Sequence, residues 1–282
     1  MGSRKHVNLP GVRVNLPAIT AKDRLDIEFG IANEVDFIAL SFVRSPDDII
    51  ELRNLLAKKA QSIKIVAKIE DQEGVNNIHQ IVALSDGVMV ARGDLGIETD
   101  IADLPNVQRR IVHACAKGGV RCIVATHLLE SMIDNPIPTR AEVTDVANAV
   151  YEGVDAVMLS GETGVGQYPV RCVEQLDNIT AKAERFQGLG YEKSLEVNGD
   201  KQHVAIHAVA LAESLNAAGI VVITRRGLTA DYVTNARPMS VPIYAFTNNS
   251  QSRRRLALNR SVYANRIAFS SDPEKTLQRA FD

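Results

Sequence analysis

The sequence has few cysteines, no long apolar run and no large excess of either charge. Its three cysteines, Cys115, Cys122 and Cys172, are an odd number without metal-ligand spacing. They favour a reducing compartment over a disulfide framework. No apolar run approaches the ~20 residues of a membrane span, and no targeting signal is recognised, so we predict a cytoplasmic protein without membrane association. The net charge of −2 gives no reason to predict nucleic-acid binding.

Short apolar runs rich in Val and Ile are the main structural signal. They are continuous rather than alternating, which is typical of parallel strands covered on both faces. Seven such runs predict strands at 35–42, 63–69, 87–91, 121–125, 156–159, 220–224 and 241–246. Helical spacing of apolar residues between them predicts helices at 47–56, 107–117 and 169–186. This alternation predicts an α/β fold with right-handed crossovers.

The two halves of the chain differ in organisation. Five strand–helix units up to Glu162 end in polar residues, as the strands of a (β/α)8 barrel do at the edge that carries its chemistry. Five units are too few to close such a barrel, so we expect an incomplete (β/α)8 TIM barrel. A polar, glycine-containing stretch at 187–200 predicts a linker. Residues 203–282 predict a truncated small α/β domain with two clear strands.

Lys68 and Glu70 end the second predicted strand. Residues i and i+2 of a strand point to the same face, so the ammonium and the carboxylate share one surface. An isolated pair of this kind is more often solvated, but the run before it has the composition of a buried strand. Asp94, after the third strand, adds a second carboxylate at the neighbouring strand end. Two carboxylates with substrate oxygens and water are a usual way to hold Mg²⁺. The alternative is a glycine turn with Asp94 as a helix cap.

Two further strand ends carry polar groups. Thr126 follows the fourth strand and presents a hydroxyl to the same edge, although a threonine there is often a cap. His127 beside it is more often packed or solvated than a ligand. The glycine-rich segment from Ser160 to Gly166 ends the fifth strand and resembles a phosphate loop, but no Gly-Lys-Ser/Thr follows it, so a P-loop is not predicted.

Taken together, these segments resemble the pyruvate kinase family in order and without long gaps. The matching segments are NLPG at 8–11, SFVR at 41–44, KIE at 68–70, EG at 73–74, SDGVMVARGDLG at 85–96, AT at 125–126, LESM at 129–132, PTRAE at 138–142, DVANAV at 145–150 and MLSGET at 158–163. The C-terminal match is looser: the segment 224–230 is similar to the family's effector-phosphate loop. Two departures are His127, where the family has Gln, and Gly164, where it has Ala.

The resemblance implies phosphoryl transfer from phosphoenolpyruvate to ADP in glycolysis, giving pyruvate and ATP. By similarity, Glu70 and Asp94 hold Mg²⁺ or Mn²⁺, and Lys68 stabilises charge on the phosphoryl group in the transition state. Gly93 and Asp94 offer backbone amides to the substrate carboxylate, and Thr126 lies by the enolpyruvate.

Other implied residues are less directly tied to the substrate. Ser160 and Glu162 are candidate members of a proton relay. The implied effector loop, for a phosphorylated effector, consists of Thr224, Arg225, Arg226, Gly227 and Thr229. The resemblance also implies a homo-oligomer and a K⁺ requirement, although most of the family's K⁺ ligands have no counterpart in this sequence.

The resemblance divides the chain into a partial barrel at 1–187, equivalent to family strands 4–8 without the lid domain, and a partial regulatory α/β domain at 188–282. One hypothesis is therefore an enzyme whose isolated chain is incomplete and inactive. The alternative is a non-catalytic truncated homologue that binds metal or effector, or acts as a regulatory subunit. A barrel lyase using Mg²⁺ shares the paired carboxylates, but the segments at Thr126 and 160–163 argue against it.

Overall fold

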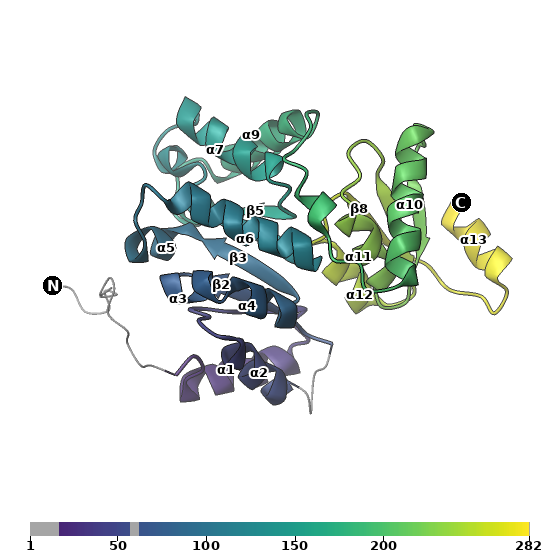
Figure 1. The fold of residues 1–282 in the computed structure, drawn as a ribbon, viewed down its shortest axis with the longest axis horizontal. Coiled ribbons are helices and arrows are strands. Elements are labelled where there is room, and N and C mark those ends of the chain that lie inside the picture. Colours follow the sequence, from purple (N-terminus) through teal and green to yellow (C-terminus); the bar gives the residue numbers. More distant parts are fainter. Residues whose placement is uncertain (1–16, 57–61, 282) are drawn as a thin grey trace.

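The chain folds into two parallel β-sheets with helices packed against them (Figure 1). The computed structural model describes residues 17–56 and 62–281, so the match at 8–11 lies outside the described residues. The strands are β1 Phe37–Leu40, β2 Lys64–Ile69, β3 Gly87–Ala91, β4 Arg121–Ala125, β5 Ala156–Met158, β6 Ile220–Ile223, β7 Ile243–Thr247 and β8 Val262–Arg266. The α-helices are α1 Ala21–Ala32, α2 Pro46–Leu56, α3 Gln72–Asn76, α4 Ile78–Leu84, α5 Arg92–Glu98, α6 Leu104–Gly118, α7 Arg140–Tyr151, α8 Gly161–Gly164, α9 Pro169–Ala183, α10 Asp200–Ser214, α11 Leu228–Asn235, α12 Ser250–Leu256 and α13 Pro273–Phe281, with 3-10 turns η1 Glu130–Ile133 and η2 Tyr191–Ser194.

The first sheet has the order β1-β2-β3-β4-β5, and every neighbouring pair is parallel. The face toward the helices forms the larger core, in which Ile65, Val88 and Val124 are fully buried. The other face carries a smaller cluster around Val66 and Met89. Coverage of both faces explains why the strands appear in the sequence as continuous apolar runs. Within the described residues, β1 and β5 are each paired on one side only, so the sheet is open there.

The second sheet has the order β6-β7-β8, again parallel. The two strands predicted in this region are confirmed as β6 and β7, and β8 is a third that was not predicted. Its residues are partly buried or exposed, and Tyr263 is 61% exposed. An edge strand that carries Asn265 and Arg266 lacks the continuous apolar signal from which the other strands were predicted.

Residues 187–200 contain no α-helix or strand until α10 begins, as the prediction of a linker requires, but they are attached to the first unit. The Leu189 amide donates to the Tyr151 carbonyl at 2.7 Å, and the Glu196 amide donates to the Lys117 carbonyl at 2.8 Å. The Tyr191 ring meets the His113 ring edge-on, with centroids 5.1 Å apart. The segment is therefore fixed along α6. The division of domains at 187/188 itself stays a prediction.

A buried ion network joins the two units. The Asp155 carboxylate, just before β5, accepts two hydrogen bonds from the Arg237 guanidinium, at 2.6 and 2.7 Å. It also accepts from Arg121 at 3.1 Å and from the Cys122 amide at 2.9 Å. The Asp155 side chain is 0% exposed. Two arginines and one carboxylate thus connect the N-terminal ends of β4 and β5 to Arg237, which follows α11 of the second unit.

No helix in the described part of the chain is both long and apolar enough to cross a membrane.

A substitution at Gly74 tests how closely α3 packs against the segment that follows β1. It lies buried in α3, and a Cβ added there would lie 2.6 Å from the Val43 carbonyl oxygen. Because that oxygen belongs to the backbone, Gly74→Ala must shift a chain segment, and we expect it to lower the free energy of unfolding by about 1–3 kcal/mol. Urea unfolding followed by far-UV circular dichroism measures the change.

The matched control for this substitution is Gly164→Ala. A Cβ at Gly164 meets nothing within 4 Å. We expect a change of no more than about 1 kcal/mol, in the stabilising direction, from the better helix propensity of alanine. Equal destabilisation by the two substitutions would contradict the packing of Gly74 against Val43.

Candidate active site

Three side chains meet at the C-terminal ends of β1 and β2. The Lys68 ammonium lies 2.7 Å from the Glu70 carboxylate and donates to the Ser41 hydroxyl at 2.9 Å. The Lys68 side chain is 25% exposed, whereas that of Glu70 is 1% exposed. The structure therefore confirms that the ammonium and the carboxylate share one surface. The ammonium remains open to solvent while its carboxylate partner is buried.

The Glu70 carboxylate is held from a second side. Its other oxygen accepts the backbone amide of Phe42 at 2.6 Å. Phe42 has a φ of 49°, a left-handed conformation that costs a non-glycine residue roughly 1–2 kcal/mol. The strained turn after β1 places an amide against a buried carboxylate, which fixes Glu70 in one orientation.

Asp94 lies in the first turn of α5, directly after β3, and is partly exposed. Its position inside the helix argues against the alternative of Asp94 as the residue that caps it, since Ala91 holds that place. No hydrogen bond or ion pair of its carboxylate is found among residues 17–56 and 62–281. Because β2 and β3 are neighbours, Glu70 and Asp94 follow adjacent strand ends.

Thr126 connects the ends of β3 and β4. Its hydroxyl accepts the Gly93 amide at 2.8 Å and donates to the Ala125 carbonyl at 2.6 Å. Thr126 follows β4, and its hydroxyl accepts an amide from the first turn of α5, the helix that follows the neighbouring strand β3. Thr126 therefore caps that helix. Both Thr126 and His127 have left-handed φ angles, 69° and 54°. Such strain is typical of functional sites.

Arg92 lies in the candidate site, and the sequence analysis did not single it out. It is 7% exposed, and its guanidinium donates to the Thr126 carbonyl at 2.7 and 3.1 Å and to the Asp145 carboxylate at 2.7 Å. It therefore fixes the strained turn at Thr126. Ser41 was recognised only as a polar strand end, without a role. The sequence feature that could have identified Ser41 and Arg92 is their position, because both lie at the end of a strand and inside a segment that matches the family.

Glu162 and Ser160 occupy different environments. The Glu162 side chain is buried, and its two oxygens accept the backbone amides of Leu129, at 3.1 Å, and Ser160, at 2.8 Å. Glu162 therefore ties the segment after β4 to the segment after β5. Ser160 is exposed beside it. Participation of either residue in proton transfer stays a prediction.

The candidate effector loop lies between β6 and α11, away from the first sheet's C-terminal edge. The Thr224 hydroxyl accepts the Gly227 amide at 3.1 Å, and Gly227 has a φ of 92°. The Thr247 hydroxyl donates to the Arg225 carbonyl at 3.1 Å. Arg225, Arg226 and Thr229 are exposed. The loop is thus a rigid turn with two arginines at its surface.

The donor set suits a hard divalent cation that also takes oxygens from a substrate. Glu70 and Asp94 are two carboxylates at neighbouring strand ends, and Mg²⁺ is usually held by one or two such groups with substrate oxygens and water. In the described ranges, no group of three or more His, Cys, Asp or Glu side chains is placed to hold a metal by itself. Glu70 and Asp94 thus fit Mg²⁺ or Mn²⁺ only as part of a shared site.

Comparisons with known proteins identify the family of the chain. Residues 1–173 match the family model described as pyruvate kinase, barrel domain, and residues 202–282 match the one described as pyruvate kinase, alpha/beta domain. The chain is 46% identical over 271 residues to the pyruvate kinase of Dictyostelium discoideum, which covers 93% of the chain and 53% of that protein.

Bacterial proteins match over nearly the whole chain. It is 45% identical over 285 residues to the pyruvate kinase of Bacillus licheniformis, covering 99% of the chain and 48% of that protein. The chain is also 45% identical over 287 residues to the pyruvate kinase of Geobacillus stearothermophilus, again covering 99% of the chain and 48% of that protein. The chain spans about half the length of the curated relatives it matches.

Proposed function

The chain belongs to the pyruvate kinase family, and from that premise we propose that it carries the metal- and phosphoenolpyruvate-binding part of a phosphoryl-transfer site. The reaction converts phosphoenolpyruvate and ADP into pyruvate and ATP. The bond from phosphorus to the enol oxygen breaks, a bond to the terminal ADP oxygen forms, and the enolate takes up a proton at C3. The contact of the Lys68 ammonium with the buried Glu70 carboxylate is the main support.

Each residue has a distinct part in the proposal. Lys68 places a cation where charge develops on the phosphoryl group, and Glu70 fixes that cation. Glu70 and Asp94 would hold Mg²⁺ or Mn²⁺, which would supply positive charge against the phosphate oxygens. Thr126 and the amides of Gly93 and Asp94 orient the enolpyruvate and its carboxylate, with Arg92 as a positioning residue behind Thr126. The implied K⁺ is assigned no residue of this chain.

The Gly93 amide already has a partner in the Thr126 hydroxyl, at 2.8 Å. Substrate binding in the proposed mode therefore exchanges this hydrogen bond for one to the carboxylate, or shares it. In this structure the Gly93 amide and the Thr126 hydroxyl lie at hydrogen-bonding distance from each other. That closeness supports assigning both to the same end of the substrate.

A proposal of the same kind covers the second unit. We assign the turn from Thr224 to Thr229 to a phosphorylated effector, because a rigid turn with exposed arginines suits a phosphate group. A homo-oligomer is also proposed, on the resemblance alone.

Activity is tested in a chimera in which this chain replaces the matching half of the Geobacillus stearothermophilus relative. We expect ADP-dependent pyruvate formation, followed with lactate dehydrogenase, because the catalytic side chains would come from this chain. Residues 1–282 alone are expected to show none. A chimera that is folded by circular dichroism but inactive would favour the alternative of a non-catalytic metal- or effector-binding subunit.

Metal binding can be measured on residues 1–282 without turnover. We expect weak Mn²⁺ binding by electron paramagnetic resonance, lowered about tenfold or more by either Glu70→Gln or Asp94→Asn, because each removes one of two charged ligands. The control is Asp100→Asn, which alters an exposed carboxylate shortly after α5 and should leave the affinity unchanged. Retention of full affinity in both site variants would refute the assigned ligands.

A further inference from the structure

A cavity lies at the opposite end of the first sheet from Lys68. It has a volume of about 170 Å³ and is enclosed by the N-terminal ends of β1, β2 and β4 together with α11 and α12 of the second unit. Lys64 begins β2 and lines this cavity, while Lys68 lies four residues further along, about 13 Å away at the usual rise of a strand. The cavity is therefore separate from the candidate active site.

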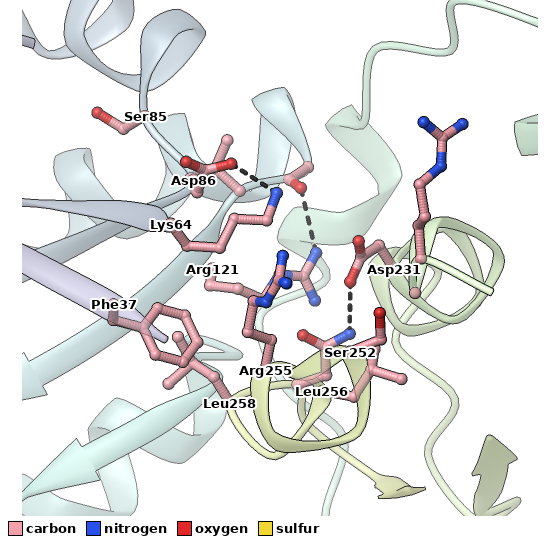
Figure 2. A pocket seen from close by; sticks show the side chains of 15 residues that line it. Phe37, Lys64, Ser85, Asp86, Arg121, Asp231, Ser252, Arg255, Leu256 and Leu258 are labelled. Carbon is pink, nitrogen blue, oxygen red and sulfur yellow. Dashed lines mark hydrogen bonds and ion pairs between the residues drawn. The ribbon is translucent and has the colours of Figure 1, made fainter. Parts of the chain in front are cut away.

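The cavity is rich in positive charge. Four cationic side chains line it, against two carboxylates, Asp86 and Asp231. The cationic ones are Lys64, Arg121, Arg226 and Arg255. Figure 2 shows the guanidinium groups of Arg121 and Arg255 in the middle of the cavity, between Lys64 on one side and Asp231 on the other. The positively charged side chains thus come from both units of the fold, Lys64 and Arg121 from the first and Arg226 and Arg255 from the second.

Both carboxylates are already engaged by other partners. Asp86 lies 2.7 Å from the Lys64 ammonium and 2.9 Å from the Arg53 guanidinium. Asp231 accepts the side-chain amide of Asn259 at 2.8 Å. Arg121 is also committed, since it pairs with Asp155 at 3.1 Å. Asp86 is thus paired with two cations, whereas Asp231 accepts one neutral hydrogen bond, and positive charge remains in excess in the cavity.

Arg255 carries a buried donor that has no partner among the described residues. Its Nε is buried and makes no hydrogen bond to any described residue. Burial lowers the pKa of the Arg255 guanidinium, against the raising effect of Asp36 and Asp86. A buried donor without an acceptor costs roughly 1–3 kcal/mol, and more when it is charged. An anion in the cavity would remove that cost.

We propose that this cavity binds a small phosphate-bearing anion, with the Arg255 guanidinium as its principal ligand. The planar fork of an arginine matches two phosphate oxygens, and Ser252 and Asn259 add polar groups to the wall. The volume accommodates a phosphate group with some water. Because Lys64 and Arg121 come from the first unit and Arg255 from the second, the bound anion stabilises the contact between them.

This site differs from the proposed effector loop, although Arg226 and Gly227 border both. Arg225 belongs to the loop and does not line the cavity, whereas Arg255 lines the cavity and does not belong to the loop. The two proposals can therefore fail independently. Phosphate could also bind at Lys68, so the binding series is run in a Lys68→Met background, which removes the cation of the active site.

The test measures binding of inorganic phosphate to residues 1–282 by isothermal titration calorimetry, at constant ionic strength adjusted with NaCl. We expect saturable binding in the cavity, weakened at least tenfold by Arg255→Gln. Arg253→Gln removes an exposed arginine of the same helix and should change this affinity less than twofold. Arg225→Gln removes an exposed arginine of the proposed effector loop, so any further binding that it abolishes belongs to that loop. Arg255→Lys, which keeps the charge but loses the fork, should weaken binding at least threefold and serves if Arg255→Gln does not fold.

Wild-type affinity in folded Arg255→Gln or Arg255→Lys would overturn the proposal. Equal weakening by Arg253→Gln would do so too, since it would indicate general attraction to a basic helix. If Arg225→Gln alone abolished binding, the phosphate site would be the effector loop and not the cavity.

Discussion

Lys68→Met is expected to lower the turnover of the active chimera by about 10²–10³-fold or more, with a much smaller effect on the Michaelis constant for phosphoenolpyruvate. A rigid cation aimed at developing charge contributes roughly 3–4 kcal/mol to transition-state stabilisation, and methionine fills a similar volume without the charge. The reason for the rigidity is geometric, because Ser41 and Glu70 hold the ammonium at 2.9 and 2.7 Å.

The control for this variant is Lys182→Met, which removes an exposed lysine from the last turn of α9. It should leave turnover unchanged. Loss of Lys68 also leaves the buried Glu70 carboxylate without its cation, so circular dichroism and Mn²⁺ binding must be compared in parallel. A reduction in turnover below tenfold, in a protein that folds normally, would mean that Lys68 does not act on the phosphoryl group.

The second large effect is expected at the contact between the two units. Asp155→Asn should lower the free energy of unfolding by about 3–5 kcal/mol at pH 7, because it leaves two buried guanidinium groups without their carboxylate. Arg121 is 6% exposed and the Arg237 side chain 10% exposed, so neither can regain full hydration in place. Urea unfolding followed by circular dichroism measures the change, which suits a chain without tryptophan.

The same carboxylate makes stability depend on pH. Burial acts to raise the pKa of Asp155, but the charges of Arg121 and Arg237, with hydrogen bonds from Arg237 and Cys122, outweigh it and hold the pKa at about 2, below its ordinary 3.8. A depressed pKa stabilises the fold when the carboxylate is charged. The contribution, roughly 2–3 kcal/mol, is therefore present above pH 5 and is lost as the pH falls from about 4 to 2.

Two comparisons make this prediction specific. Asp26→Asn alters an exposed carboxylate paired with Lys22 within α1, and it should cost no more than about 0.5 kcal/mol. Asp155→Asn should also flatten the acid limb of the stability profile, whereas Asp26→Asn should not. A cost below 1 kcal/mol for Asp155→Asn, or an unchanged acid limb, would contradict the role assigned to the ion network.

Much of the first sheet was predictable because its signals are local. A strand covered on both faces must be apolar at every position, so β2, β3 and β4 were placed within a residue of their observed bounds. The surface shared by Lys68 and Glu70 followed from the two-residue period of a strand. The candidate site was found because its polar residues lie at or within a few residues of the ends of such strands.

Edges and turns were less predictable. β8 was missed because its outer residues are polar or exposed, and an edge strand is defined by the neighbour it pairs with. The role of Arg92 also escaped detection, since its acceptors are the Thr126 carbonyl and Asp145, which lies 53 residues away. Nothing in the local sequence around Arg92 records either contact.

By itself, then, the sequence determined the family, the α/β class, most strands and which strand ends carry charge, because each depends on residues close together in the chain. The tertiary structure alone decided that Glu162 holds two backbone amides, that Asp155 pairs with Arg237 across 82 residues, and that the Nε of Arg255 is buried without a hydrogen bond to any described residue. Those outcomes depend on which distant groups share a low-dielectric space. Burial sets the free energy of a charge there, and burial is a property of the packed molecule.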